Sequence, residues 1–288
     1  MKVLRTGAIL ILLSVLLVVA GGAIGGRGGM QIALVMAALM NFVSYFFSDK
    51  IALMSSGARP VTREQLPRLY EVMERLAAKA SIPVPKLYVV PDMAPNAFAT
   101  GRNPSHASVA VTEGLLKIMN DDELEGVIAH ELSHVRNYDI LTSSIAATVA
   151  GAITYLASMA KWGMILGGFG RGREDDREGG GFAALLMIFL APFAAMLLQL
   201  FLSRTREYAA DETGARMVGQ PYGLISALEK LGAYNRQIRT SAISPSTSSL
   251  CIVKPLFGSG TLSSLFSTHP PLEERIAALK QMVNAPLR

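Results

Sequence analysis

The chain has 288 residues, of which 51% are hydrophobic and only 17% charged, and its formal net charge is +5 at pH 7. This apolar excess excludes an ordinary soluble globular protein. The basic residues form no run and are interleaved with acidic ones, which argues against nucleic-acid binding. The single cysteine, Cys251, rules out an internal disulfide framework and agrees with a reducing compartment.

Four uncharged blocks account for the apolar excess, and each has the length of about 20 residues that a helix needs to span a bilayer. They cover residues 6–24, 30–48, 140–160 and 182–202. We predict four transmembrane helices, TM1 to TM4, in two hairpins at residues 1–48 and 140–202. Lys2 and Arg5 could also open a signal peptide, but a second apolar block follows closely, so we interpret the first block as a retained anchor.

The positions of Lys and Arg predict the orientation, because positive charges favour the cytoplasmic side of a membrane. Lys2 and Arg5 place the amino terminus inside. Residues 49–139 and 203–288 then lie on the same side, while the two short connections within the hairpins lie outside. We expect a multi-pass protein of the cell (inner) membrane whose cytoplasmic domain is built from these two segments.

The first of these segments begins with helical and then strand-like patterns. Thr62, with Gln65 three residues later, is a capping-box signature that predicts the start of a helix. Strands are predicted at residues 86–90, 97–100 and 108–112, and we expect a small antiparallel sheet. An extended peptide substrate could pair with its edge, with Asn96, Ala97 and Phe98 as candidate substrate-binding residues. Asn96 follows Pro95, so its alternative role is that of a turn residue.

A second helix is predicted to begin near Asp121, because Asn120 followed by Glu123 is a capping box. It carries the sequence His130-Glu131-Leu132-Ser133-His134. Two histidines four residues apart point to the same side of a helix and can share a metal ion. This is the H-E-x-x-H arrangement, in which the histidines hold zinc and the glutamate is the general base. The sequence therefore predicts one Zn²⁺ per chain, rather than two surface histidines beside a solvated glutamate.

Catalytic zinc generally takes three protein ligands, so a third ligand is needed beside the histidines. The candidates are Glu207, Asp211, Glu212, His106 and His269. Glu207 and Asp211 share a helix face, so one could bind the metal while the other hydrogen-bonds a ligand imidazole. The alternative is a charged helix next to the membrane. His269, just before two prolines, could stabilise an oxyanion or only cap a loop that enters a helix.

The motifs together resemble the HtpX family of membrane-embedded zinc proteases of bacterial quality control, which is similar to the CAAX prenyl proteases of eukaryotes. The stretches that carry the resemblance are Asn96–Gly101, His130–His134, Ser203–Asp211 and Thr268–Pro271. The resemblance covers nearly the whole chain. It implies that Glu207 is the third zinc ligand, which defines a gluzincin, that Asp211 supports a ligand histidine, and that the catalytic domain faces the cytoplasm.

The expected fold is a mainly α membrane protein with a zincin-like α+β catalytic domain and a small sheet. The expected activity is zinc-dependent hydrolysis of peptide bonds in misfolded or damaged membrane proteins, as part of quality control and the stress response. Two alternatives stay open, a CAAX-type prenyl-protein endopeptidase and a catalytically silent zinc-binding scaffold. The expected partners are protein substrates and the lipid bilayer, with no nucleic acid, and the sequence gives no oligomeric state. Residues 237–262, rich in Ser, Thr, Gly and Pro, are predicted to form a flexible loop.

Overall fold

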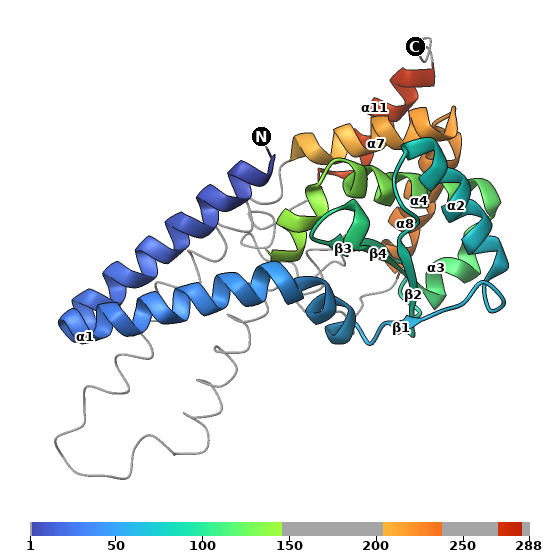
Figure 1. The fold of residues 1–288 in the computed structure, drawn as a ribbon. Coiled ribbons are helices and arrows are strands. Elements are labelled where there is room, and N and C mark those ends of the chain that lie inside the picture. The colour runs from blue at the N-terminus through green and yellow to red at the C-terminus, as the bar shows by residue number, and fades with distance from the viewer. Residues whose placement is uncertain (1, 146–203, 238–269, 284–288) are drawn as a thin grey trace.

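The chain begins with a long helix, α1 (Lys2–Ser55), that folds back on itself. The computed structural model describes residues 2–145, 204–237 and 270–283. Figure 1 shows α1 as two antiparallel arms that project from the rest of the molecule. The reversal lies in the glycine-rich stretch of the sequence, where Gly26 has a φ of +58°. Glycine adopts this left-handed conformation without the steric cost that a side chain would add.

Contacts between the two arms hold this hairpin together. A Cβ atom at Gly21 would lie 2.5 Å from the Cβ of Ala33, so the arms approach closely only because residue 21 has no side chain. Further from the turn, the side-chain amide of Asn41 donates a hydrogen bond of 2.8 Å to the hydroxyl of Ser14. An interhelical hydrogen bond between polar side chains is a common stabilising contact of helices in lipid.

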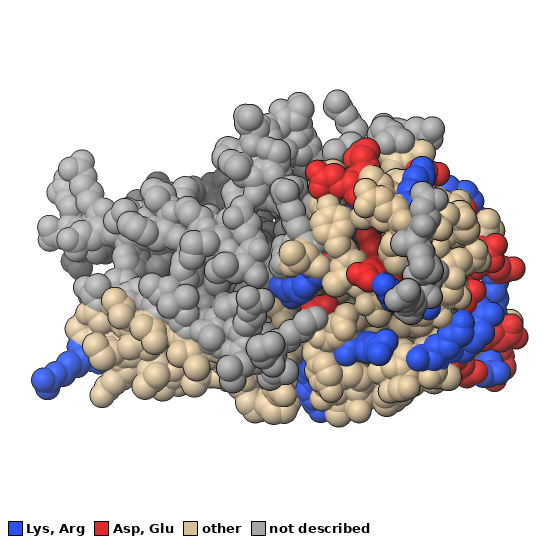
Figure 2. Space-filling model, turned by 90° about the horizontal axis from the view of Figure 1, so that it is seen from above, with Lys and Arg blue, Asp and Glu red and all other residues tan. Residues whose placement is uncertain are grey.

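The surface of α1 is apolar, whereas the rest of the described protein carries many charged side chains. Figure 2 shows these charged side chains gathered away from α1 and few on the described surface of α1. Ile32 and Val35 are 69% and 66% exposed. Within the described residues, one helical stretch, Gly26–Ser55, is long and apolar enough to cross a membrane. The count of four spans stays a prediction, because nearly all of the last two predicted blocks falls outside the described residues.

A mixed sheet of four strands follows, in the order β1-β2-β4-β3. The strands are β1 (Arg59–Pro60), β2 (Lys86–Val90), β3 (Ala97–Gly101) and β4 (Ala107–Thr112). The prediction of a purely antiparallel sheet is wrong for one pair, since β2 and β4 are parallel. The chain leaves β2, forms β3 at the edge, and returns as β4 into the place between them. β4 is therefore antiparallel to β3 and runs in the direction of β2.

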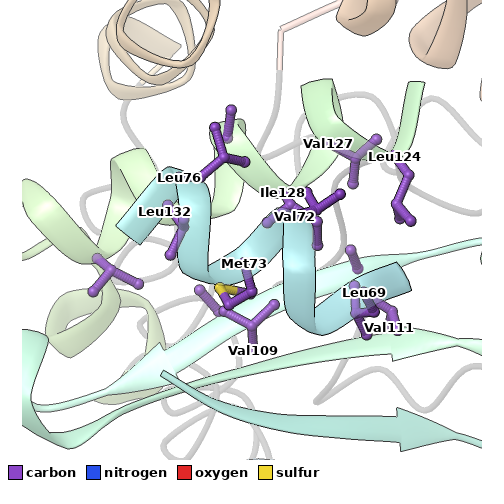
Figure 3. Packing of buried hydrophobic residues seen from close by; sticks show 14 of the residues in the cluster. Leu69, Val72, Met73, Leu76, Val109, Val111, Leu124, Val127, Ile128 and Leu132 are labelled. Atoms are coloured by element: carbon purple, nitrogen blue, oxygen red, sulfur yellow. The ribbon is translucent and has the colours of Figure 1, made fainter. Parts of the chain in front are cut away.

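Helices cover both faces of the sheet. One face packs against α2 (Pro67–Ala80) and α4 (Asp121–Arg136), and Figure 3 shows the apolar side chains of these helices meeting those of β4. The members of this cluster labelled there are Leu69, Val72, Met73, Leu76, Val109, Val111, Leu124, Val127, Ile128 and Leu132. The other face carries Phe98, which packs in a cluster with Ala52 and Leu53 of α1. Burial of apolar side chains from both faces stabilises the sheet and joins it to α1.

Helix α4 lies at the centre of the remaining helices. The others are η1 (Pro104–His106), α3 (Glu113–Ile118), α7 (Arg204–Val218), α8 (Tyr222–Gln237) and α11 (Leu272–Val283). Both α7 and α8 pack along α4, and α11 packs on α7 and α8. The predicted capping box at Asn120 and Glu123 is confirmed, with both of its hydrogen bonds formed. The predicted helix start at Thr62 is wrong, because Thr62 and Gln65 form a turn and α2 begins at Pro67, a residue suited to the first helical turn.

The buried Glu123 also fixes α4 to α8. Its carboxylate accepts hydrogen bonds from the hydroxyl of Ser226 at 2.6 Å and from the ammonium of Lys230 at 2.7 Å. Burial alone would raise the pKa of Glu123, but these donors and the charge of Lys230 lower it below its usual value. The carboxylate therefore stays ionised at the N-terminus of α4, where negative charge also favours the helix dipole.

Gly214 sets the distance between α7 and α4. A Cβ atom at this position would lie 3.0 Å from the backbone nitrogen of His130 and 3.2 Å from its Cα. The two helix backbones approach this closely only because residue 214 has no side chain. The contact is at the turn of α4 that carries the first motif histidine.

We expect Gly214→Val to destabilise the protein by about 1–3 kcal/mol, because its methyl groups overpack the contact between the two helices. Thermal unfolding of the detergent-purified chain measures the effect. Glu212→Ala on the same helix is the matched control, since the Glu212 side chain is 53% exposed. An unchanged midpoint for Gly214→Val would show that the helices can separate without cost.

Candidate metal centre

Helices α4 and α7 bring three side chains together with their polar atoms facing one another. His130 and His134 come from consecutive turns of α4, and their Nε2 atoms are 3.2 Å apart. Glu207 comes from the first turn of α7. Its Oε2 atom lies 3.6 Å from Nε2 of His130, and its Oε1 atom lies 3.6 Å from Nε2 of His134. One atom from each residue can be chosen so that all three lie within 4.8 Å of one another.

The chemistry of this donor set fits a zinc ion. Two neutral imidazole nitrogens and one carboxylate oxygen are ligands that Zn²⁺ takes in catalytic sites, where three protein ligands leave a position for water or substrate. His130 and Glu207 are buried, and the His134 side chain is 16% exposed. The site therefore opens on the side of His134, while the protein encloses the other two residues.

Behind His130, a buried ion pair supports the ring from its far side. The Nδ1 atom of His130 lies 2.9 Å from the carboxylate of Asp211. Arg275 of α11 donates two hydrogen bonds to the same carboxylate, at 2.6 and 2.8 Å. Burial alone would raise the pKa of Asp211, but the charge and hydrogen bonds of Arg275 hold it below its usual value. Asp211 is therefore an anion that can accept a hydrogen bond from the Nδ1–H group. This tautomer leaves Nε2 without a proton and free for a metal.

His134 has a comparable partner in Asp139, just after the end of α4. Its Nδ1 atom lies 3.5 Å from the Asp139 carboxylate, which is buried. Burial lowers the pKa of His134, but the hydrogen bond to Asp139 and the charges of Glu207 and Glu131 outweigh it and raise the pKa to about 9. The acidic surroundings therefore favour positive charge on the His134 ring.

The structure separates the five candidates for the third ligand. Glu207 joins the histidines, whereas Asp211 contacts the opposite nitrogen of His130. Glu212 points away to an exposed ion pair with Arg216, and His106 is exposed beside Asn103. His269 lies outside the described residues.

The remaining predicted residues lie on α4 and at the edge strand that packs against it. Glu131 is 4% exposed on α4 between the histidines, and its negative charge raises the pKa of both His134 and Arg275. Asn96 is buried at the start of β3, where its backbone hydrogen-bonds Thr112 of β4. β3, with Ala97 and Phe98, is the edge strand and packs against α4.

Sequence reasoning missed Arg275 and Asp139. Arg275 is fully buried, and its guanidinium lies 3.6 Å from Glu207 as well as binding Asp211. A signal was present, because Arg275 is four residues before Leu279, on the buried face of the last amphipathic helix. A charge at an inward position indicates a buried partner. Asp139 gave only a weaker signal, as one acid at the end of a polar stretch.

The comparisons with known proteins agree on one protein family. The profile of peptidase family M48 matches residues 63–283. A protease HtpX homolog of Desulfatibacillum aliphaticivorans is 55% identical over 276 residues, which are 96% of this chain and 88% of the relative. One from Pyrococcus furiosus is 50% identical, over 96% of this chain and 95% of the relative.

A solved structure has the same fold at low sequence identity. The crystal structure of S. mikatae Ste24p superposes with a TM-score of 0.51 at 19% identity, and the match covers 95% of this chain but 62% of Ste24p. This chain thus spans less than two thirds of Ste24p, and the likeness establishes the fold alone. With the profile match and the close relatives, it follows that the chain belongs to peptidase family M48, as a membrane metalloprotease of the HtpX type.

Proposed function

We propose that the protein is a zinc-dependent endopeptidase of the gluzincin type, with His130, His134 and Glu207 as the zinc ligands. The observation that carries this proposal is the convergence of these three side chains from two helices far apart in the sequence. Zinc held there supplies a Lewis acid that polarises the scissile carbonyl and makes a water molecule more acidic. One ion per chain satisfies the donor set.

Glu131 is the proposed general base. It follows the first ligand on α4, is buried, and its charge acts on the second ligand, so it is suited to act as base for a water that zinc would hold. It takes the proton of the attacking water and then delivers it to the leaving amine. A carboxylate can do both steps because it alternates between its ionised and protonated forms.

Asp211 and Arg275 position the site rather than take part in the reaction. Asp211 fixes the ring of His130 through Nδ1, and Arg275 fixes Asp211 through two hydrogen bonds. The guanidinium also offsets part of the negative charge of Glu207, Asp211 and Glu131. This balance limits the repulsion between carboxylates that would otherwise oppose folding around an empty site.

The proposed substrates are misfolded or damaged membrane proteins, cleaved at the cytoplasmic face of the cell membrane. Several observations support this. The apolar hairpin α1 joins the sheet directly, and the positive charges at the chain start favour the cytoplasmic side. The edge strand β3, which packs against α4, can offer main-chain groups to an extended peptide. Binding through main-chain hydrogen bonds tolerates many peptide sequences.

Two other functions predict different outcomes. A CAAX-type prenyl-protein endopeptidase would use the same chemistry but cleave a farnesylated peptide in preference to an unfolded protein. A catalytically silent scaffold would bind zinc and cleave neither substrate. The full set of ligands, base and positioning residues favours an enzyme over the scaffold.

Glu131→Gln should abolish peptide hydrolysis, by at least about a hundredfold, and keep zinc bound, because the amide cannot accept a proton. Cleavage of an unfolded protein by the detergent-purified, zinc-loaded chain measures this, with bound zinc determined on the same samples. Activity close to that of the unchanged chain would transfer the base role to another residue.

Glu207→Ala should weaken zinc binding strongly, because only the two histidines would remain as ligands. Zinc affinity is measured by competition with a chelator of known affinity. Glu212→Ala, five residues later on the same helix, is the matched control and should bind zinc like the unchanged chain. Equal zinc affinity of both variants would remove Glu207 from the ligand set.

Arg275→Met should destabilise the fold by about 3–5 kcal/mol, because it leaves the Asp211 carboxylate buried without its guanidinium. Adding Asp211→Leu should recover most of that stability but leave zinc affinity about 10–100-fold weaker, since His130 then lacks its acceptor. Thermal unfolding and chelator competition separate the two effects. If the double variant binds zinc normally, Asp211 does not position His130.

A further inference from the structure

The register of β3 shows which of its main-chain groups face the outer edge of the sheet. Asn96 is paired with Thr112 of β4, whose N–H donates a hydrogen bond of 2.9 Å to the Asn96 carbonyl. Residues of an antiparallel strand alternate in direction, so Phe98 and Thr100 also turn their N–H and C=O groups toward β4. Ala97, Ala99 and Gly101 then direct theirs outward. In the described part of the chain, no strand lies on that side.

One of these outward groups is already bonded within the protein. The N–H of Gly101 donates a hydrogen bond of 3.2 Å to the hydroxyl of Ser144. The main-chain N–H of Gly101 therefore faces away from β4. The same hydroxyl lies 2.7 Å from the hydroxyl of Thr100. Ser144 is fully buried in helical residues 139–145, directly after the helix that carries the metal ligands.

We propose that Ser144 ends the peptide-binding edge of β3, so that a bound substrate pairs with Ala97 and Ala99 and no further. The hydroxyl occupies the position in front of Gly101 that a substrate carbonyl would otherwise take. At the other end, the residue before Asn96 is Pro95, which has no N–H to donate to a peptide. The edge therefore offers two outward residues, and this inference rests on the proposed peptidase function.

This arrangement determines how substrates are read. Two outward residues recognise two main-chain N–H groups of the peptide, two residues apart, whichever direction the peptide runs. Recognition through the main chain does not select for side chains. Because Ser144 follows the metal-binding helix closely in the chain, the end of the edge is fixed relative to the site where the peptide bond is cut.

The test is a backbone N-methyl scan of a peptide substrate. The detergent-purified, zinc-loaded full chain first digests carboxymethylated α-lactalbumin, and a synthetic peptide spanning the main cleavage site is then methylated at one backbone nitrogen at a time. We expect two positions, two residues apart on one side of the cut bond, where methylation lowers kcat/KM about tenfold or more. Methylation of the residue between them should have much less effect.

Ser144→Ala should add a third sensitive position, two residues further along, because the peptide can then pair with Gly101 and donate its own N–H to the Gly101 carbonyl. Thr100→Val is the matched control, since it removes the other hydroxyl of the pair and leaves Ser144 on Gly101. It should keep two sensitive positions. If Ser144→Ala fails to fold, as judged by its zinc content and thermal unfolding, Ser144→Cys replaces it, because sulfur is a weak acceptor.

The outcomes separate this inference from the proposed function. No cleavage of the unmethylated peptide by the zinc-loaded chain would contradict the peptidase itself. Cleavage without an alternating pattern would overturn the pairing with Ala97 and Ala99. An alternating pattern that is the same in the Ser144 variant and the unchanged chain would overturn the role of Ser144 alone.

Discussion

The close contact between α4 and α7 is the constraint on which the site depends. The two motif histidines face one side of α4, but the third donor, the carboxylate of Glu207, is more than seventy residues away in the sequence. Gly214 lets the backbone of α7 approach His130, and this places Glu207, two turns earlier, at the imidazole nitrogens. A larger side chain at the contact would move the donor atom away from the histidines. The metal centre is therefore a product of helix packing as much as of the motif.

Charge balance is the second constraint, because several acids share a small buried volume. Glu207, Asp211 and Glu131 are all at most 5% exposed, and carboxylates in such surroundings repel one another. Arg275 is a fixed positive charge among them, while a bound zinc ion would add two more. A permanent charge from α11 makes the fold less dependent on the metal. It also makes the last helix part of the site, although it supplies no ligand.

The sheet connects the membrane hairpin to the reaction centre. On one face of β3, Ala97 and Ala99 belong to the core shared with α2 and α4. On its other face, Phe98 packs with the end of α1. One short strand thus contacts both the apolar hairpin and the catalytic helix. A peptide that adds to its edge, as we propose, would lie beside a strand that packs against both the apolar hairpin and the helix with the metal ligands.

Local patterns in the sequence determined the elements that depend on neighbouring residues. The capping box at Asn120, the spacing of His130 and His134, and the strands near residues 86, 97 and 108 were all predictable, because i to i+4 geometry and alternation act within a few residues. Glu207 was one of five candidates until resemblance to a family singled it out. The predicted direction of one strand pair was wrong, since it depends on where β3 lies in the sheet.

The tertiary structure alone decided which distant residues meet. It showed Arg275 beside Asp211, Asp139 beside His134, and Ser144 in front of Gly101, none of which a periodic pattern reveals. The physical reason is that ion pairs and hydrogen bonds need contact within a few ångströms. Such contact between residues far apart in the chain follows only from how helices and strands pack.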